Sequence, residues 1–139
     1  MQPVPILIHH DAVKLTVRCN FERMTNVLLH LVQNAQEATA DTGKVTITVS
    51  SDQANGLIEI LDSGHGMSDS FINNELFRPF KTTKGNAGMG IGVYESKDYI
   101  ESLGGKINVS SEVGTGTKFR IILPAINPNN SSQVTSDNG

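Results

Sequence analysis

Three polar side chains of the helix predicted over residues 21–40 share one of its faces. His30, Asn34 and Glu37 occupy positions i, i+4 and i+7, which form a single stripe beside the apolar stripe. The amide oxygen of Asn34 suits a hard cation, and Mg²⁺ is usually held by few protein oxygens together with phosphates. The spacing indicates a metal ligand at Asn34, and a solvated helix face is the alternative interpretation.

A second candidate is Asp62, which ends a predicted strand and is followed by Gly64 and Gly66. A carboxylate at a strand end can accept a hydrogen bond from an exocyclic amine such as that of adenine. Glycines let the backbone approach a flat ring closely, because they lack a Cβ atom. The group indicates a base-binding site, and a tight turn with a solvated aspartate is the alternative.

Three glycines, Gly88, Gly90 and Gly92, immediately precede and open a predicted helix. Free backbone N–H groups and the positive end of the helix dipole favour a phosphate at such a position. Lys84 lies just upstream and could add a mobile positive charge. The sequence has no Gly-Lys-Ser/Thr, and no βαβ unit surrounds the glycines, so neither a Walker nor a Rossmann site is predicted. A flexible loop is the alternative.

Hydrophobic periodicity predicts the elements that must hold these residues. Apolar positions recur at helical spacing over residues 21–40, whereas apolar residues alternate with threonines over residues 45–49. Asn55-Gly56 is typical of a hairpin turn. The pattern predicts an α+β fold, a two-layer sandwich with one mostly antiparallel mixed sheet covered on one face by about three helices. The predicted helices cover residues 21–40, 69–77 and 90–103, and the predicted strands cover residues 4–8, 13–18, 45–49, 57–61, 106–111 and 117–123.

The composition is that of a single domain with an aliphatic core. The chain has 139 residues, no Trp and a net charge of −3 without a basic block, which argues against nucleic acid as a partner. No apolar run approaches the ~18 residues of a membrane span, and no signal peptide is evident, so a cytoplasmic domain without direct membrane contact is expected. Cys19, the only cysteine, is expected to be buried. Residues 1–124 are expected to form the domain and residues 125–139 a disordered polar tail.

Five short segments, in this order, resemble the catalytic ATP-binding domain of sensor histidine kinases, within the superfamily that includes gyrase, the Hsp90 chaperone and the MutL repair protein. The resemblance extends over roughly residues 4–124 and implies a Bergerat-type ATP-binding fold, in agreement with the two layers predicted from periodicity. The segments are HLVQNAQEA (residues 30–38), DSGHGM (62–67), ELFRPFKTTK (75–84), AGMGIGV (87–93) and GTGTKF (114–119).

The resemblance implies a role for each matching residue. Asn34 would bind Mg²⁺, Asp62 would contact adenine, and residues 68–88 would form a mobile lid anchored by Phe77 and Phe80. His30 and Glu37 would lie beside the reacting groups. The base pocket would be lined by Gly64, Gly66, Met67 and Thr117, and the phosphates would be held by Lys84, Gly88, Gly90 and Gly92.

Position 30 distinguishes between activities within the superfamily. Relatives that hydrolyse ATP, such as gyrase and Hsp90, carry a glutamate four residues before the asparagine, where it activates a water molecule, and the anti-sigma kinases also have it. This chain has His30 instead. The substitution favours a protein histidine kinase over an ATP hydrolase of the gyrase, Hsp90 or MutL type, and a domain that acts only through partner binding is a third possibility.

The same resemblance predicts the partners. The γ-phosphate of ATP would pass to a histidine on a separate dimerisation and phosphoacceptor domain, and a response regulator would act downstream. His9-His10-Asp11 is a poor acceptor candidate because no amphipathic helix follows it. The chain is therefore expected to bind ATP without phosphorylating itself, as the catalytic part of a kinase. Membrane attachment of a parent protein stays open.

Overall fold

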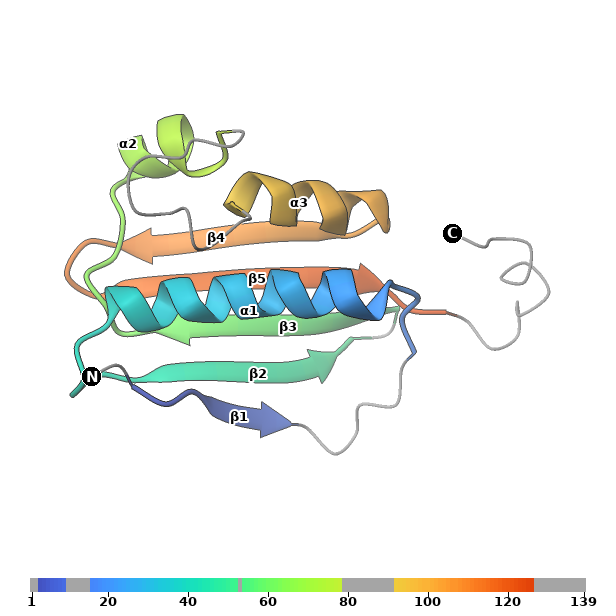
Figure 1. Ribbon diagram of the computed structural model, residues 1–139, viewed down its shortest axis with the longest axis horizontal. Coiled ribbons are helices and arrows are strands. Elements are labelled where there is room, and N and C mark those ends of the chain that lie inside the picture. Colours follow the sequence, from blue (N-terminus) through green and yellow to red (C-terminus); the bar gives the residue numbers. More distant parts are fainter. Residues whose placement is uncertain (1–2, 10–15, 53, 79–91, 127–139) are drawn as a thin grey trace.

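The computed structural model describes residues 3–9, 16–52, 54–78 and 92–126, which form one mixed β-sheet with helices on one side (Figure 1). In these residues the sheet has five strands in the order β1-β2-β3-β5-β4. The first pair, β1 with β2, is parallel, and the other pairs are antiparallel, which confirms the predicted sheet. The strands are β1 (Ile6–His9), β2 (Val45–Ser51), β3 (Asn55–Asp62), β4 (Lys106–Glu112) and β5 (Gly116–Pro124).

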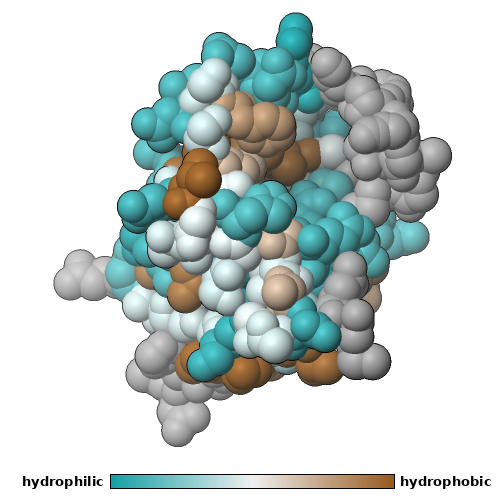
Figure 2. Space-filling model, turned by 90° about the vertical axis from the view of Figure 1, so that its left-hand side faces the viewer, coloured by the Kyte–Doolittle hydropathy of each residue, from teal (hydrophilic) through white to brown (hydrophobic). Residues whose placement is uncertain are grey.

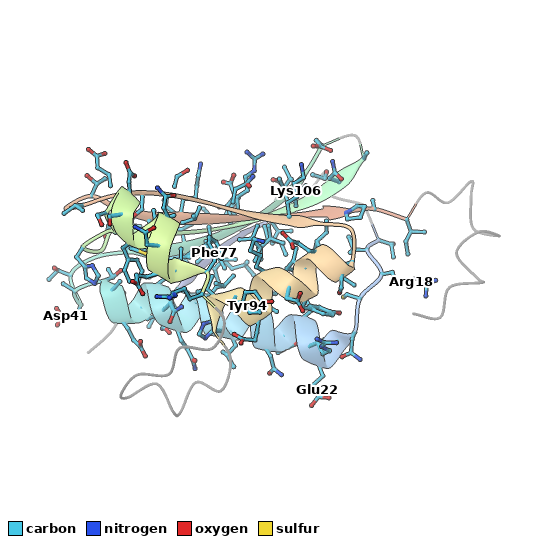
Figure 3. All side chains as sticks on the ribbon, turned by 90° about the horizontal axis from the view of Figure 1, so that it is seen from above. Arg18, Glu22, Asp41, Phe77, Tyr94 and Lys106 are labelled. Carbon is cyan, nitrogen blue, oxygen red and sulfur yellow. The ribbon has the colours of Figure 1, made fainter. Side chains whose placement is uncertain are left out.

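The helices cover a single face of this sheet, as predicted. Figure 3, seen along the edge of the sheet, shows α1 and α3 on one side, whereas Lys106 points away from the other side. None of the helices in the described residues is long and apolar enough to span a membrane. The helical segments are α1 (Phe21–Ala38), α2 (Asp69–Phe71), its π-helical continuation η1 (Ile72–Leu76) and α3 (Val93–Ser102).

The core lies between the two layers and is mainly aliphatic. Leu31 of α1, Ile60 of β3 and Ile100 of α3 are almost completely buried in it. Each such side chain stabilises the fold by about 1.5–3 kcal/mol relative to leaving it in water. The apolar stripe of α1 begins one turn after Asn20, whose side chain accepts a hydrogen bond from the backbone N–H of Arg23 at 2.9 Å and caps the helix.

Two expectations for the segment before α1 are wrong. Residues 16–18 of the predicted strand 13–18 form no strand, and residues 13–15 lie outside the described residues. The Thr16 carbonyl accepts a hydrogen bond from the backbone N–H of Ile126 at 2.7 Å, but residues 16–18 do not pair with a neighbouring strand. Cys19 is exposed, not buried, because it stands directly before the capping residue Asn20 at the surface.

The predicted hairpin turn at Asn55-Gly56 is also wrong, since both residues already belong to β3. The turn is formed instead by Asp52, whose carboxylate accepts backbone N–H groups from Ala54 at 3.0 Å and Asn55 at 2.9 Å. These two hydrogen bonds lower the pKa of the exposed Asp52 carboxyl group. An aspartate turn therefore sets the register of β2 against β3.

The pairing of β3 with β5 places the end of one strand beside the start of the other. In this register Asp62 lies opposite Thr117. Figure 1 shows that α1 ends at the same end of the sheet, and that α2 lies there too. The sheet thus gathers segments that are distant in sequence at one end of the domain.

Candidate functional site

A cavity of about 500 Å³ lies at this end of the domain, between α1, the segment that contains α2 and η1, and β5. Its volume is within the range of small-molecule sites. Figure 2 shows this end of the molecule, where brown apolar side chains are exposed within a largely hydrophilic upper half. Six of the residues predicted for the site line the cavity, namely Asn34, Glu37, Asp62, Gly66, Met67 and Thr117.

Asp62 is held in one orientation by the backbone around it. Its side chain is buried, and its Oδ1 atom accepts backbone N–H groups from Gly64 at 2.9 Å and Thr117 at 3.2 Å. No other hydrogen bond to its carboxylate is found within the described part of the chain. The Oδ2 atom is therefore available to accept a hydrogen bond from a ligand in the cavity.

Ser111 of β4 joins two segments of the cavity wall, the loop with Met67 and strand β5, and no sequence pattern indicated this role. Its hydroxyl group accepts the backbone N–H of Met67 at 2.7 Å and donates to the carbonyl of Gly116 at 2.9 Å. Its single proton is thereby used, so the Thr117 hydroxyl donates to Ser111 across 2.7 Å. The Thr117 oxygen keeps a lone pair for a ligand.

The two glycines after Asp62 are required by contacts within the protein. A Cβ atom on Gly64 would lie 2.2 Å from the carbonyl oxygen of Ala38, at the end of α1. Gly66 has a φ of +75°, and a Cβ atom there would lie 2.1 Å from the carbonyl oxygen of Glu112. Gly64 is buried behind the cavity wall, whereas Gly66 forms part of it. The glycines thus fix the loop that carries Asp62 and Met67.

The polar stripe on α1 differs in burial along its length. His30 is buried, Asn34 is half-buried and Glu37 is exposed, so the whole stripe is not a solvated face. The Nε2 atom of His30 lies 3.3 Å from the Nδ2 atom of Asn34. Burial lowers the pKa of His30 from 6.5, and the nearby Glu95 carboxylate only partly opposes this shift, so the imidazole is neutral at neutral pH.

The lowered pKa of His30 predicts that stability falls with acid. The unfolded chain protonates this histidine near pH 6.5, but the folded protein does so only at lower pH, so the unfolded state binds more protons in between. The free energy of unfolding is therefore highest, with respect to this group, above pH 6.5. It decreases as the pH falls toward the pKa of His30 in the folded protein. Urea unfolding across this range should show the slope in the wild type and a smaller slope in His30→Leu. Equal slopes would contradict the assignment, and the exposed His65→Gln serves as the control.

The structure describes the second glycine segment, residues 87–93, only from Gly92 onward. The N–H of Gly92 donates to Oε1 of Glu95 at 2.8 Å, which caps the start of α3. Glu95 was not among the predicted site residues, because an acidic residue in a first helical turn is common. Lys84, Gly88, Gly90 and Phe80 lie outside the described residues.

The predicted lid over residues 68–88 is helical where it is described. Ser68 caps α2 by accepting the backbone N–H of Phe71 at 3.1 Å, and η1 continues the helix to Leu76. Phe77 packs partly against the core, and the Lys97 ammonium of α3 lies 5.8 Å from its ring centroid. Figure 3 shows Phe77 at the end of the helical segment, toward α3. The anchoring role of Phe77 stays a prediction.

The cavity holds few groups that could bind a metal by themselves. Among the described residues no cluster of three or more His, Cys, Asp or Glu side chains could do so. Asn34 and Glu37 supply oxygen atoms at the cavity, and a cation bound there would need further ligands from a bound molecule. This donor set suits a cation that arrives with phosphates.

The fold and the cavity together define a class of protein: a nucleotide-binding α/β sandwich without a P-loop, with an asparagine on α1 and an aspartate at the end of β3. The family model of histidine kinase-, DNA gyrase B- and HSP90-like ATPases matches residues 19–127. The chain belongs to this family.

Curated relatives specify the branch of the family. Sporulation kinase D of Bacillus subtilis is 33% identical over 110 residues, which cover 79% of this chain and 21% of the relative. Sensor protein SrrB of Staphylococcus aureus is 34% identical over 109 residues, which cover 76% of this chain and 19% of the relative. The chain thus spans about a fifth of the length of these relatives.

Solved structures support the same assignment. The catalytic domain of histidine kinase ThkA superposes with a TM-score of 0.72 at 30% identity, covering 86% of this chain and 78% of that one. The mycobacterial sensor histidine kinase MprB, at 20% identity and a TM-score of 0.71 over 87% of this chain and 82% of that one, shares the fold. The chain is a histidine kinase-type ATPase domain, as its sequence segments indicated.

Proposed function

We propose that this domain binds Mg-ATP and donates the γ-phosphate to a histidine on a separate dimerisation and phosphoacceptor domain, with a response regulator downstream in two-component signalling. The observation that carries the proposal is that Asp62 and Asn34, from β3 and α1, line one cavity. An adenine acceptor and a metal ligand are therefore available to the same nucleotide.

The base would bind beside Asp62. With Oδ1 engaged by the backbone, Oδ2 can accept the exocyclic amine of adenine. The Thr117 hydroxyl oxygen lies next to this carboxylate across the strand pair and can accept a second hydrogen bond. Met67, Leu76 and Phe119 provide apolar surface for the ring. A polar end and an apolar body are what an adenine ring requires.

The metal would be held mainly by the nucleotide. Asn34 directs its Nδ2 toward His30, so its Oδ1 is free for a cation, and the Glu37 carboxylate lies one turn further along α1. When bound, Mg²⁺ stabilises negative charge on the phosphoryl oxygens. The oxygens of Asn34 and Glu37 would hold the ion, and most of its ligands would come from phosphate and water.

The environment of His30 supports transfer to a protein over transfer to water. A water molecule attacks phosphate efficiently only when a base accepts its proton. The His30 imidazole is buried, and its Nε2 atom is engaged by the Asn34 amide. It is therefore unavailable as that base, whereas a histidine acceptor needs none, because a neutral imidazole is already a nucleophile.

Asn34→Ala is expected to reduce phosphotransfer from radiolabelled ATP to the phosphoacceptor domain of the parent kinase by about 100-fold, because the metal loses its protein amide ligand. The matched control is Gln33→Ala, an exposed neighbour on the same helix, which should transfer at the wild-type rate. An undiminished rate in Asn34→Ala would overturn the metal assignment. Steady ATP hydrolysis by the wild-type domain alone would favour the hydrolase alternative.

A further inference from the structure

His30 contacts the proposed metal ligand Asn34 on its own helix, α1. The N–H of Gly92 donates to Oε1 of Glu95 at 2.8 Å, and the Glu95 carboxylate is close enough to act electrostatically on His30. The Nε2 atom of His30 lies 3.3 Å from Nδ2 of Asn34. Both helices lie on the same face of the sheet, where α1 and α3 are in contact (Figure 1).

The fold itself gives no reason for a histidine at position 30. His30 is 6% exposed, and its Nδ1 atom is buried without a hydrogen-bond partner among the described residues. A buried polar atom without a partner lowers stability, and an aliphatic side chain would fill the same space without this cost. Such an unsatisfied group calls for an explanation outside the packing of the core.

The contact with Asn34 supplies that explanation. An asparagine amide has a donor end and an acceptor end, and rotation by half a turn exchanges them. A neutral imidazole whose Nε2 atom accepts a hydrogen bond attracts the donor end, Nδ2. The acceptor end, Oδ1, then faces the cavity that Asn34 lines. An apolar residue at position 30 would leave both orientations open, and one of them turns an N–H toward the metal.

We propose that His30 is a positioning residue, which orients the Asn34 amide so that Oδ1 faces the metal position. This inference rests on the proposed binding of Mg-nucleotide. Groups that orient a metal ligand from behind commonly change metal affinity as much as 10- to 100-fold. His30 belongs to this category, and it does not need to touch the nucleotide.

The test is calorimetry of ADP binding, with Mg²⁺ and with a chelator, to the whole chain. The quantity of interest is the ratio of the two affinities. In His30→Leu and His30→Phe this ratio should fall about 10-fold, while the metal-free affinity stays within about twofold of wild type. His30→Gln, whose Oε1 can accept from the Asn34 amide, should recover most of the ratio.

A merely structural role predicts a different result. Loss of packing would lower the melting temperature and both affinities together, and His30→Gln would give no rescue. We expect His30→Leu to melt at or above the wild-type temperature, because it removes the unsatisfied Nδ1 atom. A wild-type ratio in both His30→Leu and His30→Phe would overturn the positioning role and leave the proposed function intact. A wild-type domain that gains no ADP affinity from Mg²⁺ would overturn both.

Discussion

Asp62→Asn is expected to lower the affinity for ADP by roughly 100- to 1,000-fold, or about 3–4 kcal/mol, with little change in unfolding. The reason is the direction of the hydrogen bonds at this side chain. The amide oxygen of the asparagine can still accept the backbone N–H groups of Gly64 and Thr117. Its NH₂ group then stands where Oδ2 accepted, and two donors face each other when adenine binds.

Calorimetry with ADP measures this effect directly, and urea unfolding verifies that the fold persists. The matched control is Asp41→Asn, which removes the same charge from an exposed turn and should bind ADP as the wild type does. Wild-type affinity in Asp62→Asn would refute the adenine assignment. Equal losses in both variants would mean that overall charge, and not the acceptor, determines affinity.

Gly66→Ala is expected to destabilise the folded domain by at least about 3 kcal/mol, which is a large part of the stability of a small domain. The backbone φ of +75° at this residue is unfavourable for any side chain, and the new Cβ atom would lie 2.1 Å from the carbonyl oxygen of Glu112. Because the obstacle is backbone, neither partner can rotate away. The loop would have to separate from β4, and the Met67 contact with Ser111 would be lost.

Gly114→Ala separates the cost of the positive φ from the cost of the close contact with Glu112. Gly114 has a similar φ of +86°, but a Cβ atom there meets nothing within 4 Å. Its replacement should therefore cost only the conformational part, about 1 kcal/mol. Chemical unfolding of both variants measures the difference. If Gly66→Ala lost no more stability than Gly114→Ala, the close approach to Glu112 would not be what requires glycine.

Much of the fold was predictable because its signals are local. Alternation predicted β2, and the 3.6-residue period predicted α1 to within two residues of its end at Ala38. The errors arose where local signals compete. Asn55-Gly56 is a strong turn pair, yet the Asp52 carboxylate forms the turn and draws both residues into β3. Residues 16–18 have a strand pattern but no partner strand.

The candidate site was predictable in part. Asn34 and Asp62 were identified by their residue types beside recognisable segments, and both line the cavity. Ser111 and Glu95 were missed, because a serine in a strand and an acidic residue in a first helical turn are common. The contact that matters for Ser111, with the backbone of Met67, joins residues that are 44 positions apart in the sequence.

Residue types and their periodicity were enough to predict which residues could bind a nucleotide and which elements carry them, because side-chain chemistry and periodicity are properties of short segments. Which of those residues lie side by side, and how deeply each is buried, follows from the packing of the domain. The register of β3 against β5 sets Thr117 beside Asp62, 55 residues away. The packing of α1 and α3 on one face of the sheet buries His30 and brings Glu95 close to it. Burial and long-range register result from the packing of the whole domain, which no local pattern specifies.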